Sequence, residues 1–93
     1  MSTVVSVDEP NLYAAITSST VVKSGSGTCS GIFVSSLTST PSITVYDNVS
    51  GTSNPIVATF APVAGTWYHV PAIFNNGLNV VISGTCSLTV FYR

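Results

Sequence analysis

The chain has 93 residues, a length that favours one small domain, and it is 45% hydrophobic and only 5% charged. Two basic side chains and a net charge of −1 exclude the positive stripe that nucleic acid requires, so we expect no nucleic-acid partner. No run of about 18 apolar residues occurs and no secretory signal opens the chain, so we expect no membrane role and synthesis in the cytoplasm.

The first 19 residues fit no regular pattern of strands. We predict that 1–19 form an extended N-terminal arm in front of a domain that covers 20–93. Pro10 and the acidic pair Asp8–Glu9 argue against a central strand in this region. The stretch NLYAAITS at 11–18 is the one part of the chain that resembles a helical turn.

Seven runs rich in β-branched and aromatic residues follow, separated by turn signals. They are Thr20–Lys23, Thr28–Ser36, Ser42–Asp47, Ile56–Ala61, Thr66–Val70, Leu78–Ile82 and Cys86–Arg93. Their length and spacing predict an all-β fold, either an antiparallel β-sandwich or a jelly-roll-like barrel of about seven to eight short strands. Alternation places Ile32 and Val34 on one face of their strand. Cys29, Gly31 and Phe33 then share the other face.

The pentapeptide SGTCS occurs twice and contains the two cysteines, Cys29 and Cys86. Two interpretations remain open. The sulfurs form a disulfide if the two strands bring their Cα atoms within about 7 Å. Alternatively, each cysteine is a small buried hydrophobe, which the shared face of Cys86 with Leu88 and Val90 favours. Two cysteines and one histidine without a CxxC spacing argue against a metal site.

His69 is the one histidine, so a Ser/His/Asp or Cys/His site would have to use it. It lies in the aromatic strand TWYHVP, and no serine stands in a G-x-S-x-G turn. We therefore predict no catalytic residue, no cofactor and no enzyme. Asp47 and Asn48 are typical of a turn in which short side chains bond the amides that follow, and Asn75–Gly77 are typical of a second such turn.

Low charge indicates a surface made partly for contact with other protein, because buried contacts then desolvate few ions. The residues that we assign to such an interface are Pro10, Leu12, Tyr13, Trp67 and Tyr68. Aromatic side chains are enriched in protein interfaces, although the same rings are equally suited to a sugar-binding face or a core. Bare sheet edges and low charge also favour self-association into a closed ring.

The segments TVVKSGSGTCSGIFV, ITVYDN, GLNVVISGT and LTVFYR follow one another between Thr20 and the C-terminus. In this order they resemble small β-sandwich virion proteins of tailed bacteriophages, above all capsid decoration (cement) proteins. The resemblance implies a structural protein on the capsid surface that binds the major capsid protein and ties capsid subunits together. It also implies a homo-oligomer, in most cases a trimer, without catalysis or cofactor. Both cysteine positions vary in that pattern, which favours buried thiols. The alternative is a phage fibre or baseplate part, or a carbohydrate-binding β-sandwich module.

Overall fold

The computed structural model describes residues 12–93, and this part of the chain forms six strands without a helix. The strands are β1 (Leu12–Ile16), β2 (Thr20–Ser24), β3 (Gly27–Tyr46), β4 (Pro55–Phe60), β5 (Thr66–Phe74) and β6 (Gly77–Tyr92). Every pairing between them is antiparallel, which confirms the predicted all-β antiparallel class. Among the residues described, none belongs to a helix with the length and apolarity for crossing a membrane.

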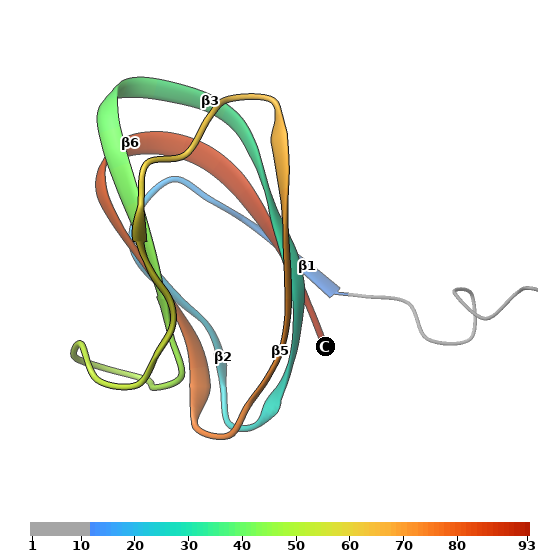
Figure 1. Cartoon of the computed structure of the whole chain (residues 1–93). Helices are drawn as coiled ribbons and strands as arrows, with labels where there is room; N and C mark the ends of the chain where they lie inside the picture. Colours follow the sequence, from blue (N-terminus) through green and yellow to red (C-terminus); the bar gives the residue numbers. More distant parts are fainter. Residues whose placement is uncertain (1–11) are drawn as a thin grey trace, which may run out of the picture.

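Strands β3 and β6 are 20 and 16 residues long and bend over together as one antiparallel pair (Figure 1). At the bend Ser39 has a φ of 62° and Gly84 a φ of 93°, both in the left-handed region. A side chain at Gly84 would meet the buried Pro41. Glycine adopts this conformation at no steric cost, so the two strands turn here while they remain paired on either side.

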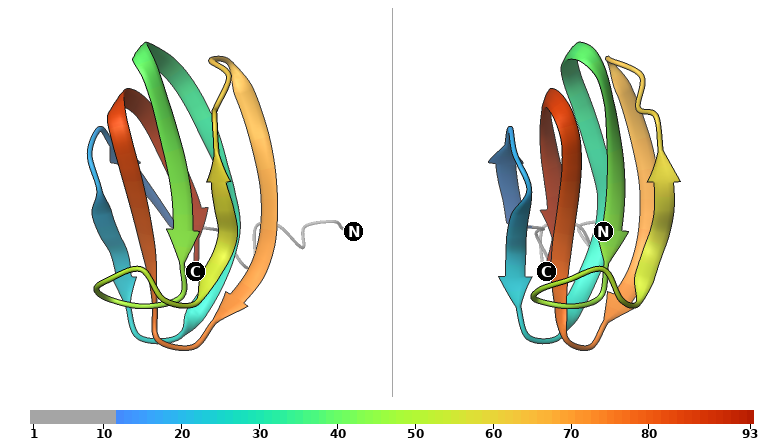
Figure 2. Two further views of the ribbon diagram at one scale, coloured as in Figure 1. Left: turned by 60° about the vertical axis from the view of Figure 1, so that its left-hand side comes forward. Right: turned by 90° about the vertical axis from the view of Figure 1, so that its left-hand side faces the viewer.

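The bend produces two layers that face each other (Figure 2). One layer has the order β1, the second half of β6, the first half of β3, and β5; we call it the β1–β5 layer. The other has the order β2, the first half of β6, the second half of β3, and β4, and is the β2–β4 layer. The core between them consists of Ile16, Cys29, Ile32, Val34, Ile43, Val45, Phe74, Leu78, Val80, Cys86, Leu88 and Val90.

The predicted number of separate short strands is wrong. Thr28–Ser36 and Ser42–Asp47 are parts of the single strand β3, and Leu78–Ile82 and Cys86–Arg93 are joined in β6. The left-handed backbone conformations of Ser39 and Gly84 let these strands bend without ending, at the places where glycine and serine had suggested turns. The two SGTCS copies are therefore not equivalent, because one opens β3 and the other lies at the bend of β6.

The residues Leu12–Ile16 form β1 and not a part of an arm outside the sheet. They pair with residues 88–92 of β6, so the proposed boundary at residue 19 does not separate an arm from the sheet. Ala14 and Ile16 face inward and pack against the core, which fixes this edge strand. The helical turn considered for 11–18 is likewise replaced by a strand over 12–16. The rest of the predicted arm, 1–11, lies outside the described residues.

The two cysteines lie far apart in the β1–β5 layer. Cys29 is opposite Tyr92 and Cys86 is opposite Leu37, so the cysteines are six residues apart along β6. At about 3.3 Å per residue this is about 20 Å, well beyond the reach of a disulfide. Both thiols are free and buried, so the disulfide interpretation is wrong. A register shift after Cys29 turns its side chain inward, although alternation had placed it with the outward Phe33.

Both thiols are expected to react slowly in the folded protein. Burial raises the pKa of Cys29 to about 11 and also raises the pKa of Cys86, so little thiolate exists at neutral pH. We predict that a thiol reagent detects two free thiols per chain only after denaturation, and that a reductant leaves the melting temperature unchanged. Fewer than two thiols in freshly denatured protein kept from air would contradict the assignment.

Candidate functional site: two surfaces that meet at strand β5

The polar residues considered for chemistry are not brought together. His69 is exposed on β5. The Asp47 carboxylate accepts a hydrogen bond of 3.0 Å from the amide of Asn75. Asn75 follows His69 by six residues, about 20 Å along an extended chain, so Asp47 lies far from His69. Within residues 12–93, no group of three or more His, Cys, Asp or Glu side chains is arranged to hold a metal ion.

Asp47 joins two loops that are distant in the sequence. Its carboxylate accepts hydrogen bonds from the amides of Asn75, Asn76 and Gly77 at 3.0, 2.8 and 3.3 Å. The sequence predicted two local turns, and the structure instead connects the β3–β4 loop to the β5–β6 turn across 28 to 30 residues. This connection holds the end of β3, in the β2–β4 layer, against the turn through which β5 of the other layer continues into β6.

Asp47 is expected to make the fold sensitive to acid. The amides of Asn75 and Asn76 hold the pKa of Asp47 below its ordinary value of 3.8. Because the folded-state pKa is the lower one, the charged group stabilises the fold above about pH 3.8 and this contribution is lost as pH falls through the folded value. Thermal melts of Asp47→Asn should show a lower melting temperature than wild type at neutral pH. The difference should shrink in strong acid, and an equal difference at both pH values would refute this role.

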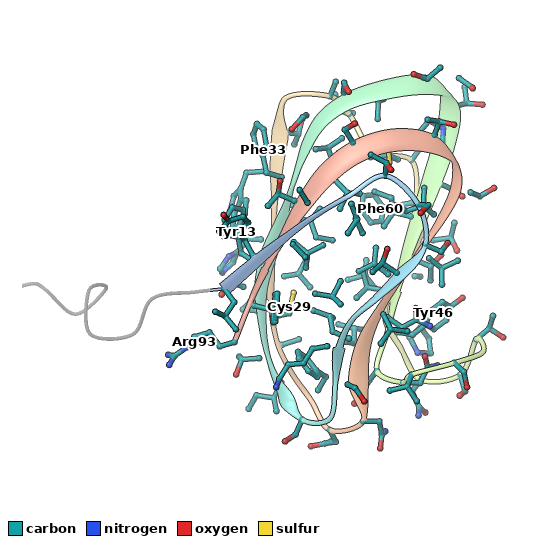
Figure 3. The ribbon with its side chains drawn as sticks, turned by 180° about the vertical axis from the view of Figure 1, so that it is seen from behind. Tyr13, Cys29, Phe33, Tyr46, Phe60 and Arg93 are labelled. Carbon is teal, nitrogen blue, oxygen red and sulfur yellow. The ribbon has the colours of Figure 1, made fainter. Side chains whose placement is uncertain are left out.

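Aromatic side chains cover the outer surface of the β1–β5 layer. Tyr13 on β1 lies opposite Phe91 on β6, and Phe33 on β3 lies opposite Trp67 on β5. We call these four residues the aromatic face. Tyr13, Phe33 and Trp67 are 71%, 38% and 46% exposed. Figure 3 shows Tyr13 and Phe33 on the same outer side of the ribbon, whereas Cys29 points into the core.

Gly31 gives the Trp67 indole its position. A Cβ atom at Gly31 would lie 2.5 Å from two indole carbons and 2.6 Å from the carbonyl oxygen of Tyr68. The missing side chain lets the indole lie across β3 and reach Phe91 on the next strand. The two rings have an edge-on geometry, with centroids 5.6 Å apart and planes at 62°. Trp67 is therefore held against the sheet while one side of its ring remains accessible.

The five predicted interface residues do not form one surface. Tyr13 and Trp67 belong to the aromatic face, whereas Tyr68 is half-buried on the inner side of β5. Leu12 is 56% exposed at the start of β1, on the side of that strand that bears Ala14 and Ile16. Pro10 lies outside the described residues. Trp67 and Tyr68 are neighbours in the sequence, and strand alternation sends them to opposite sides of the layer.

Phe33 and Phe91 are functional candidates that the interface prediction missed. Alternation in the run 28–36 had placed Phe33 on the face of the strand away from the buried Ile32 and Val34. The structure has it on that face. That pattern identified an outward ring without showing which other rings surround it. The neighbours come from β1, β5 and β6, so only the strand order reveals the face.

A second surface lies where the two layers remain open to one side. Strands β4 and β5 each pair with β3, and they form the edges of different layers (Figure 2). Between them is an apolar groove of about 570 Å³, which we call the side groove. Its lining residues are Ile56, Val57 and Phe60 of β4 and Tyr68, His69, Val70, Pro71 and Ala72 of β5.

The side groove closes at one end through an aromatic contact. The rings of Phe60 and Tyr68 have centroids 5.0 Å apart, and the Tyr68 hydroxyl accepts a hydrogen bond of 2.9 Å from the amide of Val63. Along the rest of the groove, Val70 and Ala72 are half-buried. The groove therefore exposes part of the core between the two layers.

The edge of β5 beside the side groove is poorly protected against pairing. In residues 12–93 the charged side chains are Lys23, Asp47 and Arg93, and none of them belongs to β4 or β5. Among the residue types that usually protect a sheet edge, β5 contains Pro71. Thr66–Val70 precede it and keep their backbone N–H and C=O groups for pairing with another strand. No other described strand pairs with this edge.

No family model, curated protein or solved structure matches this chain. The physical properties of the side groove and of the aromatic face are therefore the basis on which a function is inferred. Both surfaces are nearly free of charge, and both depend on β5. Trp67 belongs to the aromatic face, whereas Tyr68, Val70 and Ala72 line the side groove.

Proposed function

We propose that this chain is a capsid decoration protein, a structural virion protein that binds the outer surface of a phage capsid and stabilises contacts between capsid subunits. The observation that carries this proposal is the side groove beside the bare edge of β5. A partner that fills the groove buries apolar surface and desolvates no charged side chain of β4 or β5. After synthesis in the host cytoplasm, the protein is located on the virion surface.

The arrangement of the strands supports a jelly-roll β-sandwich as the finer architecture. If each half of β3 and β6 is treated as a strand, the fold has eight segments in two layers of four. Consecutive segments alternate between the layers, except that the second half of β3 and β4 are paired neighbours in one layer. This order corresponds to the two Greek keys of a jelly roll, an arrangement that viral capsid and lectin domains use. Because one fold serves many functions, the assignment rests on the side groove and not on the topology.

The partner that we propose for the side groove is an extended segment of the major capsid protein. Such a segment would pair with Thr66–Val70 through its backbone, as in other cases of strand addition. Its alternate side chains would enter the groove between Phe60 and Val70, because strand side chains recur every second residue. Copies of the chain that are joined to each other, each holding a segment of a different capsid subunit, would tie those subunits together.

We also propose that the protein forms a trimer through the β1 side of the molecule. Leu12 and Tyr13 are exposed there, and few charges keep copies apart. Gel filtration with light scattering should give about three times 9.6 kDa, and Leu12→Arg should reduce the mass to that of one chain. A wild-type monomer would refute self-association, and a dimer would refute the three-fold arrangement.

Phage particles made with and without this chain test the proposed function. Purified heads should contain the chain in a constant ratio to the major capsid protein, and heads that lack it should lose their DNA at a lower temperature. Absence of the chain from purified particles, or its presence in tails alone, would refute the proposal. Unchanged thermal stability of heads that lack the chain would refute the stabilising role.

A further inference from the structure

The aromatic face contains a shallow hollow of about 400 Å³ whose lining differs in character from that of the side groove. We call it the aromatic hollow. It is lined by Ser30, Phe33, Trp67, His69, Thr89 and Phe91, which come from β3, β5 and β6. Three aromatic rings thus alternate with hydroxyl and imidazole groups. Its size lies within the range of small-molecule sites, about 300–1,000 Å³.

The rings of the hollow are held in place before any ligand binds. Trp67 lies over Gly31 and packs edge-on against Phe91. Phe33 is the register partner of Trp67 on the adjacent strand. All three residues are on paired strands, and aromatic side chains have only two rotatable bonds. Little conformational entropy is therefore lost when a ligand stacks on this surface.

The polar groups of the hollow are all uncharged or weakly basic. Thr89 and His69 supply a hydroxyl and an imidazole near the rings, and none of the charged residues Lys23, Asp47 and Arg93 lines the hollow. Phosphate or carboxylate ligands would find no fixed cation here. The chemistry fits a neutral ligand that has an apolar face and a rim of hydroxyl groups.

We propose that the aromatic hollow binds a neutral glycan. A pyranose ring presents a face of C–H groups, which would stack on the accessible side of Trp67 because the indole face carries partial negative charge. Its equatorial hydroxyls would hydrogen-bond to His69 and Thr89. Phe33 would contact the neighbouring sugar unit. The rings of the hollow project from the side of the β1–β5 layer opposite to the side groove, and His69 is the one residue that lines both surfaces.

Intrinsic fluorescence tests the proposal directly, because Trp67 is the one tryptophan in the chain. Neutral gluco-, manno- and galacto-oligosaccharides are titrated into the full chain, with sialylated oligosaccharides as the acidic comparison. At least one neutral series should give a saturable change in emission. Phe33→Ala retains the Trp67 reporter and should weaken that binding about tenfold. Val21→Ala, an exposed change on β2, should leave it unaltered.

The other outcomes of this experiment overturn the proposal. No saturable change with any neutral series, at millimolar concentrations and with a folded chain by circular dichroism, excludes a neutral-glycan site. Binding of the sialylated probes alone excludes the neutral class of ligand. If Phe33→Ala instead lowers the oligomer mass or prevents capsid binding, the hollow is a protein contact. Capsid docking itself is measured with variants of the side groove, so the two proposals fail separately.

Discussion

Replacement of Ala72 by arginine is expected to abolish binding to capsids, whereas the same replacement at Ala58 is expected to leave binding intact. Ala72 is half-buried and lines the side groove, while Ala58 is exposed on β4 and does not line it. A long side chain at position 72 would fill the groove with its methylene groups and extend its charged end to water, so the fold can tolerate it. The partner segment would then lose both its space and its apolar surroundings.

Co-sedimentation of each variant with purified heads that lack the chain provides the measurement. We expect at least a hundredfold weaker binding for Ala72→Arg, because an unpaired charge against an apolar partner costs about 3 kcal/mol or more. Circular dichroism melts show whether each variant is folded. Binding of a folded Ala72→Arg variant at the wild-type level would exclude the side groove as the docking site. Equal loss at Ala58 would indicate a different contact surface on β4.

Gly27→Val is expected to destabilise the fold by about 3 kcal/mol. A Cβ atom at Gly27 would collide with the carbonyl oxygen of Arg93 and would lie 2.7 Å from the ring of Phe74. Neither neighbour can move away freely. Arg93 exchanges two backbone hydrogen bonds with Thr28, at 2.9 and 2.7 Å, and Phe74 is completely buried in the core. Such a loss is a large part of the total stability, about 5–14 kcal/mol, that is typical of a chain of this length.

Urea denaturation at neutral pH measures this effect, with Thr28→Val as the matched control. Thr28 is exposed, and valine has nearly the shape of threonine and favours strands. We expect the control to differ from wild type by less than about 0.5 kcal/mol. A midpoint for Gly27→Val close to that of the control would show that the start of β3 and the C-terminus pack more loosely than the structure indicates.

Much of the fold could be predicted because strand signals are local. Val, Ile and aromatic residues identified every strand after β1, and alternation placed Ile32, Val34 and Phe33 on their correct sides. The bend could not be predicted, because Gly84 adopts the same left-handed conformation in a bent strand as in a turn. Strand β1 was missed because its five residues gain their stability from pairing with β6, which no local pattern reports.

The candidate surfaces were predictable only in part. Trp67 and Tyr13 could be named because exposed aromatic residues are typical of interfaces. The side groove could not be predicted, since it exists where β4 and β5 form the edges of different layers. The position of the Trp67 ring likewise depends on Gly31, which is distant in the sequence and adjacent in the sheet. Such features require the strand order and register.

A cryo-EM map of purified phage heads that carry this chain tests the proposed decoration function most directly. We predict density for the two-layered fold at regular positions on the outer surface of the shell, with three copies around each occupied three-fold position. The side groove of each copy should hold an extended segment of a capsid subunit. Heads without such density, or density for this chain only in the tail or baseplate, would contradict the function proposed for it.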